Sequence, residues 1–111
     1  EKFSRFSDHW KPQIVGEVND VYIKLVKVKG SFVWHAHERE DELFLVMKGK
    51  MRLQLRTEEL PLREGELAIV PHGVEHRPVA DEEAHILLIE PKLTVNTGDV
   101  RDDRTTEAGW I

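Results

Sequence analysis

Short runs of β-forming residues, each ended by glycine, proline or a polar turn, constrain the fold of this 111-residue chain most strongly. The sequence shows no long amphipathic helical pattern between them. About seven short strands separated by turns are typical of an all-β sandwich or barrel. The predicted strands cover residues 21–29, 31–37, 43–48, 51–56, 60–62, 67–70 and 85–90.

Three local patterns add detail to this prediction. Residues 48–50 (Lys-Gly-Lys) join two of the strands and are predicted to close a β-hairpin. Phe3, Phe6 and Trp10 recur at spacings of three and four, which indicates a short N-terminal helical turn whose aromatic rings pack on the main body. Residues 110–111 give the C-terminal tail an apolar end, which we expect to dock on the barrel or on a partner.

Composition limits the class of protein. The chain is long enough for one hydrophobic core, so we expect one globular domain. The net charge is −5 and the basic residues are scattered, which argues against a nucleic-acid or membrane partner. The sequence has no cysteine, which excludes disulfides and thiolate metal ligands. A cytoplasmic location is the default expectation.

Two histidines at the end of an apolar run are the first candidate site residues. His35 and His37 lie two residues apart, and side chains in a strand alternate faces, so both imidazoles should point the same way. A cluster of carboxylates follows, formed by Glu40, Asp41 and Glu42. Two imidazoles and one of these carboxylates would form three corners of a metal site.

A distant turn offers a fourth corner. Pro71 fixes φ and Gly73 permits a positive φ, so a tight turn should come just before His76. If this turn lies beside His35 and His37, His76 completes the site. Three neutral imidazoles and one carboxylate suit Mn, Fe, Co, Ni or Zn, and such ions often keep one or two positions open for water or substrate.

These residues resemble the two sequence motifs of the cupin superfamily. The first motif has a glycine, His-x-His, a glutamate and a second glycine, matched by Gly30, His35, His37, Glu42 and Gly49. Four residues, rather than the commoner five, separate its first glycine from its first histidine. The second motif is matched by Gly65, Pro71, Gly73 and His76. Ala80 stands where cupins commonly have asparagine, so any role of that asparagine is not carried over.

The resemblance implies a double-stranded β-helix, or jelly-roll, barrel over about residues 18–91 of a single cupin domain, 1–111. Residues 1–17 would form an N-terminal arm and residues 92–111 a C-terminal tail. The implied metal ligands are His35, His37, Glu42 and His76. The superfamily includes mannose-6-phosphate isomerase-like proteins, oxalate-metabolising enzymes, dioxygenases and binding domains without known catalysis, so the fold does not select an activity.

Strand parity favours Glu42 as the carboxylate ligand. Glu42, Phe44 and Val46 share one strand face, which places the carboxylate with inward apolar groups. Glu40 and Asp41 are expected to cap the loop instead.

The remaining histidines are predicted to be surface or core residues rather than ligands: His9, His72 and His85. Arg77 flanks His76 and should point away from it if that segment is extended. The alternative is that Arg77 lines the barrel mouth and binds an anionic ligand. Arg52 and Arg56 are expected on a solvated face. Tyr22 and His85 are the only candidates for a proton-handling group near the metal.

The same parity predicts an apolar outer surface. Its members would be Phe32, Trp34, Leu43, Leu45 and Met47. Monomers rarely expose a patch of this size, so we expect a twofold homodimer, with the N-terminal arm covering part of the patch.

Together these patterns predict a metal-binding protein with a site for a small molecule inside the barrel. The expected ligand is oxygen-rich, like a sugar or a keto acid, and the expected activity is that of a metal-dependent isomerase or dioxygenase. The alternative is a metal-stabilised binding or sensing domain without catalysis.

Overall fold

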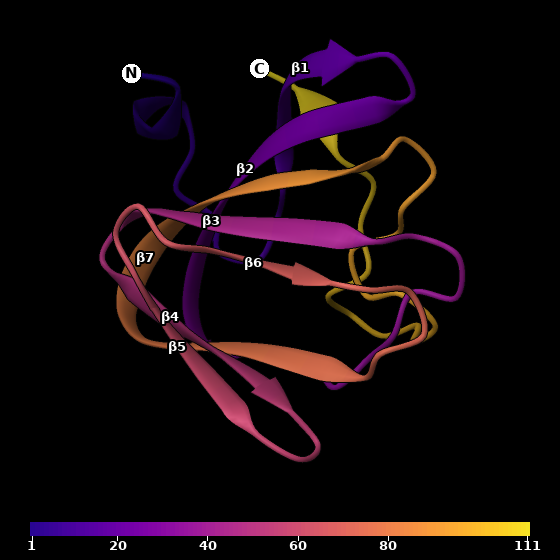
Figure 1. Ribbon diagram of the computed structural model, residues 1–111. Helices are drawn as coiled ribbons and strands as arrows, with labels where there is room; N and C mark the ends of the chain where they lie inside the picture. The colour runs from indigo at the N-terminus through magenta and orange to yellow at the C-terminus, as the bar shows by residue number, and fades with distance from the viewer.

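The computed structural model describes residues 1–111, and its regular structure is almost entirely β-sheet (Figure 1). A single 3-10 turn, η1 (Lys2–Arg5), precedes the strands. The strands are β1 (Gln13–Val18), β2 (Val21–Ser31), β3 (Glu42–Lys48), β4 (Lys50–Leu55), β5 (Glu59–Arg63), β6 (Leu67–Val70), β7 (His76–Pro91) and β8 (Gly109–Trp110). The predicted all-β class and the N-terminal helical turn are confirmed.

The long strand β7 organises the barrel. It runs for 16 residues and curves strongly, so that its two halves lie in different layers (Figure 1). One of its edges pairs with β2 along most of its length. Its other edge pairs with β4 at residues 76–79 and with β3 at residues 85–89. β5 then adds to β4, and β6 adds to β3, which completes the two layers of the jelly roll.

The predicted hairpin at residues 48–50 is wrong. β3 and β4 do not pair with each other, because each pairs with a different half of β7. Gly49 has a positive φ of 84° and carries the chain from one layer to the other. A Cβ atom at Gly49 would lie 3.3 Å from the Cβ of Ala84, so the turn also packs tightly on β7. A strand–glycine–strand pattern is typical of a hairpin, but here a long-range partner replaces the local one.

The predicted strand at residues 31–37 is also wrong. β2 continues through Gly30, which has a φ of 79°, and ends at Ser31. The next residues leave the regular pleat, and within them only His35 makes an isolated bridge, to His76. Side-chain alternation therefore fails at Phe32, which is buried instead of facing outward, although His35 and His37 still share one side.

The hydrophobic core lies between the two layers. Its largest fully buried apolar side chains are Val46, Met51, Leu53 and Ile86, which come from β3, β4 and β7. These strands alternate inward apolar and outward polar or half-buried residues, as the period of two requires. The core fills the centre and one end of the barrel, which leaves the other end for the site.

The N-terminal arm packs on the barrel through its aromatic rings, as expected. Phe3 stacks on His85, with ring centroids 4.4 Å apart, and also contacts Phe6. Trp10 stacks on Phe32 at 4.7 Å. The arm therefore closes one side of the barrel interior. Its one helical turn falls far short of the length and hydrophobicity that a membrane-spanning helix requires.

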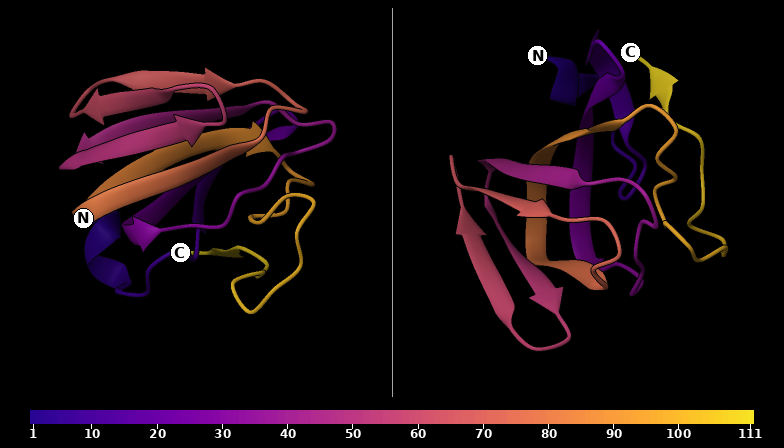
Figure 2. Two further views of the ribbon diagram at one scale, coloured as in Figure 1. Left: turned by 90° about the horizontal axis from the view of Figure 1, so that it is seen from below. Right: turned by 45° about the vertical axis from the view of Figure 1, so that its right-hand side comes forward.

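The C-terminal segment lies beside the ends of β3 and β7 (Figure 2). The amide of Asp99 donates to the carbonyl of Ala36 at 2.9 Å, and the Asp99 carboxylate accepts from the amide of Ala36 at 3.0 Å. A Cβ atom at Gly98 would lie 2.3 Å from the carbonyl oxygen of Ala36, so only glycine permits this contact. β8 then pairs in parallel with β1, so the apolar end of the tail docks on the barrel.

Candidate metal centre

Backbone pairing brings four separate side chains to one end of the barrel. The amides of His35 and His76 each donate to the carbonyl of the other, at 3.0 and 2.9 Å. The carbonyl of His37 accepts from the amide of Gly73 at 2.7 Å, which ties the His-x-His segment to the predicted turn. Glu42 and His76 are the first residues of β3 and β7. The turn therefore lies beside the His-x-His segment, which is the condition under which His76 was predicted to be the fourth ligand.

The four predicted ligands lie together and are buried. Their ligand atoms all fall within 4.8 Å of one another, and no member is more than 4% exposed. The Nε2 atoms of His37 and His76 lie 3.3 and 3.4 Å from Oε1 of Glu42. Three imidazoles around one carboxylate oxygen form a donor set suited to a divalent transition metal.

Ring nitrogens without hydrogen-bond partners indicate whether these side chains suit a metal ion. Both ring nitrogens of His37 and Nε2 of His76 are buried without a hydrogen-bond partner. A buried polar atom that lacks a partner costs about 1–3 kcal/mol. Such atoms are rare in folded proteins and need an explanation. A metal ion bound by one nitrogen of His37 and by Nε2 of His76 would supply the missing interaction for those two atoms.

The other ring nitrogens of two ligands are held by backbone carbonyls. Nδ1 of His35 lies 2.9 Å from the carbonyl oxygen of Val33, and Nδ1 of His76 lies 2.9 Å from that of Val74. An Nδ1–H group that donates to a carbonyl leaves the Nε2 lone pair free for a metal. Both rings are therefore oriented and in the correct tautomer before any metal binds.

Burial favours neutral imidazole at His35. Desolvation, and next the neighbouring His76, lower the pKa of His35 from 6.5 to about 4. The ring is therefore neutral at pH 7, as a metal ligand must be.

Two buried carboxyl groups lie side by side at this end of the barrel. Burial, and next the Glu42 carboxylate, raise the pKa of Glu90 well above its usual range, and Lys24 offsets this only in part. Burial also opposes ionisation of Glu42, but the neighbouring Glu90 and the imidazoles hold the pKa of Glu42 well below its usual range. Two carboxylates in contact cannot both ionise easily. The charge therefore resides on Glu42, which suits a metal ligand.

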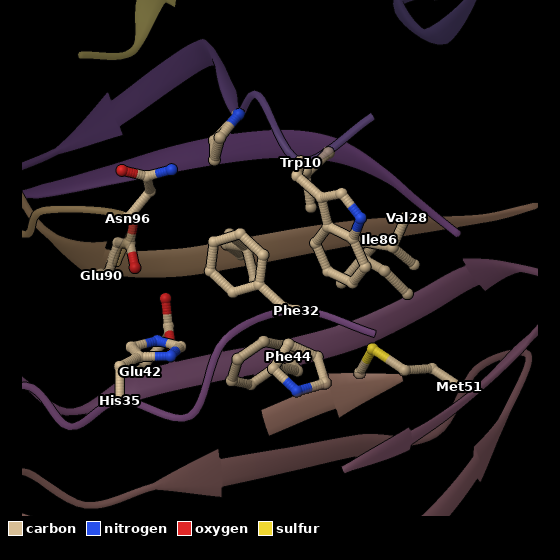
Figure 3. Close-up of a pocket in the computed structure, with 14 residues that line it drawn as sticks. Trp10, Val28, Phe32, His35, Glu42, Phe44, Met51, Ile86, Glu90 and Asn96 are labelled. Atoms are coloured by element: carbon tan, nitrogen blue, oxygen red, sulfur yellow. The ribbon is translucent and has the colours of Figure 1, made fainter. Parts of the chain in front are cut away.

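A small cavity opens beside His35 and Glu42 (Figure 3). Its polar lining, which also includes Glu90 and Asn96, lies at one end, and the rings of Phe32 and Phe44 lie towards the middle (Figure 3). Most of the lining is apolar, and the free volume is about 40 Å³. At roughly 10–15 Å³ for each water molecule, this space holds about three waters.

Sequence reasoning missed Glu90 and its partner Lys24. Nζ of Lys24 donates to Oε1 of Glu90 at 2.7 Å, and both side chains are buried. The signal was present, since Glu90 has the inward parity of Ile86 and Leu88 on β7. A charged residue in register with inward apolar residues of a strand indicates a buried charged group of this kind.

Glu40 and Asp41, the other two candidates for the carboxylate ligand, lie outside the cluster. The Asp41 carboxylate accepts from the amide of His72 at 2.8 Å and lies 2.9 Å from its ring Nδ1. Asp41 therefore caps the loop as expected, and His72 lies outside the cluster. Glu40 is half-buried and also lies outside the cluster.

The other candidate residues lie away from the cavity. His85 packs under Phe3 on the outside of the barrel, and Tyr22 contacts Trp110 at 5.7 Å. Neither lines the cavity, so neither is the proton-handling group that was expected near the metal. The Arg77 guanidinium donates to Oε1 of Gln54 and does not line the cavity either.

Three further predictions concern the surface. Arg52 bonds Asp81 at 2.8 Å at the surface. Arg56 pairs with exposed Glu75, which confirms the predicted solvated face. His9 lies 2.8 Å from Glu83 at the surface, away from the ligand cluster.

A small β-barrel with a buried cluster of three histidines and one glutamate at one end is the class of protein that this fold and site define. The Cupin domain family model matches residues 22–90, which is more than half of the chain. The chain belongs to this family.

Relatives support the same assignment. The protein YdbB of Bacillus subtilis (strain 168) is 32% identical over 78 residues, which cover 69% of this chain and 63% of YdbB. A protein of Aquifex aeolicus (strain VF5) is 41% identical over 64 residues, which cover 58% of this chain and 53% of the relative. The chain thus covers less than two thirds of either relative. A solved cupin-2 domain containing protein from Shewanella frigidimarina NCIMB 400 shares 49% identity and a TM-score of 0.80, over 81% of this chain and 88% of that one.

Proposed function

We propose that this cupin binds a divalent transition metal and presents it to a small molecule in the adjacent cavity. The ion would be Mn, Fe, Co, Ni or Zn, held by His35, His37, Glu42 and His76. The observation that carries the proposal is the set of buried ring nitrogens without partners around one carboxylate oxygen. When bound, such an ion can polarise a ligand oxygen or, if it is redox-active, support dioxygen chemistry.

The activity is proposed as isomerisation or dioxygenation of the bound molecule. Apart from the metal ligands, Glu90 is the only ionisable side chain in the cavity lining, so any proton transfer there would depend on it. Binding or sensing without catalysis is the second candidate. It is favoured by the position of Tyr22 and His85 away from the cavity.

The cavity argues for a smaller and less polar ligand than the sugar expected from the sequence. Its lining is mostly apolar and its free volume is about 40 Å³. A sugar would bury many hydroxyl groups against apolar walls without hydrogen-bond partners, which is costly. We therefore favour a short molecule with few oxygen atoms.

Metal titration tests the proposed function. The chelator-treated protein is titrated separately with each of the five ions, and thermal unfolding is followed. A free metal concentration about 100 times the Kd should raise the free energy of unfolding by about 2.7 kcal/mol. Keto acids, sugar phosphates and short hydroxycarbonyl compounds are then screened for turnover with each metal. If no ion binds, the proposal is rejected, and tight binding without turnover supports the second candidate.

We also propose that a second copy of the chain covers the outer face of β3 and β6. This outer face consists of Leu43, Leu45, Met47, Leu67 and Ile69. Leu43 lies opposite Ile69 and Leu45 opposite Leu67, so the side chains form continuous apolar rows. Met47, Leu67 and Ile69 are 49%, 54% and 59% exposed.

Two residues predicted for this patch are absent from it. Phe32 is buried against Trp10, and Trp34 is half-buried, with Arg56 stacked over its ring at 3.9 Å. The apolar rows that remain are continuous across both strands. A twofold dimer would bury them on both copies at once.

Ile69→Lys is expected to convert a dimer into a monomer, because the substitution places a charge within the apolar rows of the outer face. Analytical ultracentrifugation at micromolar concentration measures the change. Leu93→Lys is the matched control, since Leu93 is 89% exposed on the C-terminal segment, and this variant should remain dimeric. A wild-type protein that sediments as a monomer would contradict the proposed dimer.

A further inference from the structure

The C-terminal segment contacts the metal centre at the backbone between two of the proposed ligands. Ala36 lies between His35 and His37, and both of its backbone polar groups bond to a single residue, Asp99. The amide of Asp99 donates to the carbonyl of Ala36 at 2.9 Å, and the Asp99 carboxylate accepts from the amide of Ala36 at 3.0 Å. Residues 96–99, which make this contact, are called the strap.

The segment that carries these two ligands lies outside the regular strands, between β2 and β3. Its backbone therefore lacks the ladder of hydrogen bonds that fixes a strand in a sheet. His35 bonds to the backbone of His76, and the carbonyl of His37 accepts from the amide of Gly73. Ala36, between them, bonds to the strap instead. Two separate parts of the chain thus hold the segment in place.

Gly98 brings the strap against the ring of a proposed ligand. Its φ is 58°, and a Cβ atom there would lie 2.3 Å from the carbonyl oxygen of Ala36 and 2.9 Å from Cδ2 of His35. Cδ2 of an imidazole is bonded to Nε2, the nitrogen that His35 would offer to the metal. On the other side of the ring, Nδ1 lies 2.9 Å from the carbonyl oxygen of Val33. The His35 ring is therefore confined from two directions.

The strap is fastened by hydrogen bonds of its own. Thr97 is fully buried, and its hydroxyl group donates to the carbonyl of Val100 at 2.6 Å and lies 2.7 Å from Oγ1 of Thr105. The side chain of Asn96 bonds to the backbone of two later residues and lines the cavity beside the metal centre (Figure 3). Because its shape is fixed in this way, the strap can set the position of the segment that it contacts.

We infer that the strap positions His35 and His37 for the metal, and that Gly98 and Asp99 are positioning residues of the metal centre. Asp99 holds the backbone between the two ligands, and Gly98 limits the movement of the His35 ring. Residues that orient metal ligands typically contribute about 10–100-fold to metal affinity. The strap lies outside residues 22–90, which the Cupin domain model matches. This inference rests on the proposed metal site.

The test uses the full chain loaded with Co, whose visible absorption depends on the arrangement of its ligands. The spectrum is recorded, and the affinity for Co is measured by competition with a chelator. Gly98→Ala should change the spectrum and lower the affinity by about 10–100-fold, because the new methyl group displaces the Ala36 carbonyl and the His35 ring. Gly109→Ala is the matched control, since a Cβ atom there meets no atom within 4 Å, and it should match the wild type.

Two variants of Asp99 provide the test if Gly98→Ala does not fold. Asp99→Ala removes the acceptor for the Ala36 amide, so it should change the Co spectrum and weaken Co binding about tenfold or more. Asp99→Asn keeps a side-chain oxygen in the same place, so its spectrum and affinity should return close to those of the wild type. Far-UV circular dichroism checks that each variant is folded.

The outcomes separate positioning from a purely structural role. A strap that only stabilises the fold would lower the free energy of unfolding in urea and leave the Co spectrum and affinity of the folded protein unchanged. Wild-type Co binding with that result in Gly98→Ala and Asp99→Ala overturns this inference alone. A wild-type protein that binds no Co rejects the proposed metal site and this inference with it.

Discussion

His76→Ala is expected to lower the affinity of the protein for its metal ion by about 100-fold or more. Loss of a residue that only supports a metal ligand commonly costs about 10–100-fold, and loss of a ligand should cost at least as much. His76 is fully buried, and its Nε2 has no partner other than the proposed ion. Elemental analysis after exhaustive dialysis measures the loss, and far-UV circular dichroism checks that the β-rich fold remains.

His72→Ala is the matched control for this experiment. His72 lies on the same turn, but it is exposed and contacts Asp41 rather than the ligand cluster. The control variant should keep the metal content of the wild type. Full metal content in His76→Ala would show that the ion, if bound, is held elsewhere.

Lys24→Met is expected to reduce the free energy of unfolding of the metal-free protein by about 3–5 kcal/mol. Lys24 is the one cation beside two buried carboxyl groups, Glu42 and Glu90. Without it, the cluster keeps a negative charge that neither water nor another cation compensates. Urea unfolding at pH 7 measures the change, because the midpoint falls while the slope should remain similar.

Lys92→Met provides the comparison for a pair at the surface. Lys92 pairs with Glu17, but both side chains are partly exposed to water. Exposed ion pairs contribute little to stability, so this variant should unfold almost as the wild type does. If Lys24→Met were no less stable than Lys92→Met, Lys24 would not compensate the charge of the buried carboxyl groups.

The candidate site was largely predictable because its chemistry is local and its spacing is regular. His35 and His37 are two residues apart, and the turn at Pro71 precedes His76 directly. Glu42 was separated from Asp41 by parity alone, since it shares the inward face of Phe44 and Val46. Side-chain alternation holds wherever the strand is regular, and it holds along β3.

The alternation of side chains between the two faces of a strand predicts the wrong side where the backbone leaves the pleat. It also does not indicate which strands pair with each other. Phe32 follows the end of β2 and turns inward, although alternation placed it outside. The segments on either side of Gly49 have the pattern of a hairpin, yet each pairs with β7. Backbone groups in any strand can pair with those of any other strand, so a pattern along the chain cannot select among partners.

The residues of this chain thus specify its strands, its turns and the donor set of its metal site through local geometry. The assembled barrel specifies which strands pair and which distant groups meet. Lys24 and Glu90 illustrate the difference, because they are 66 residues apart and face each other only because β2 pairs with β7. Side-chain identity and alternation can be predicted from the sequence. Contacts between strands depend on long-range packing, which forms only when the whole core assembles.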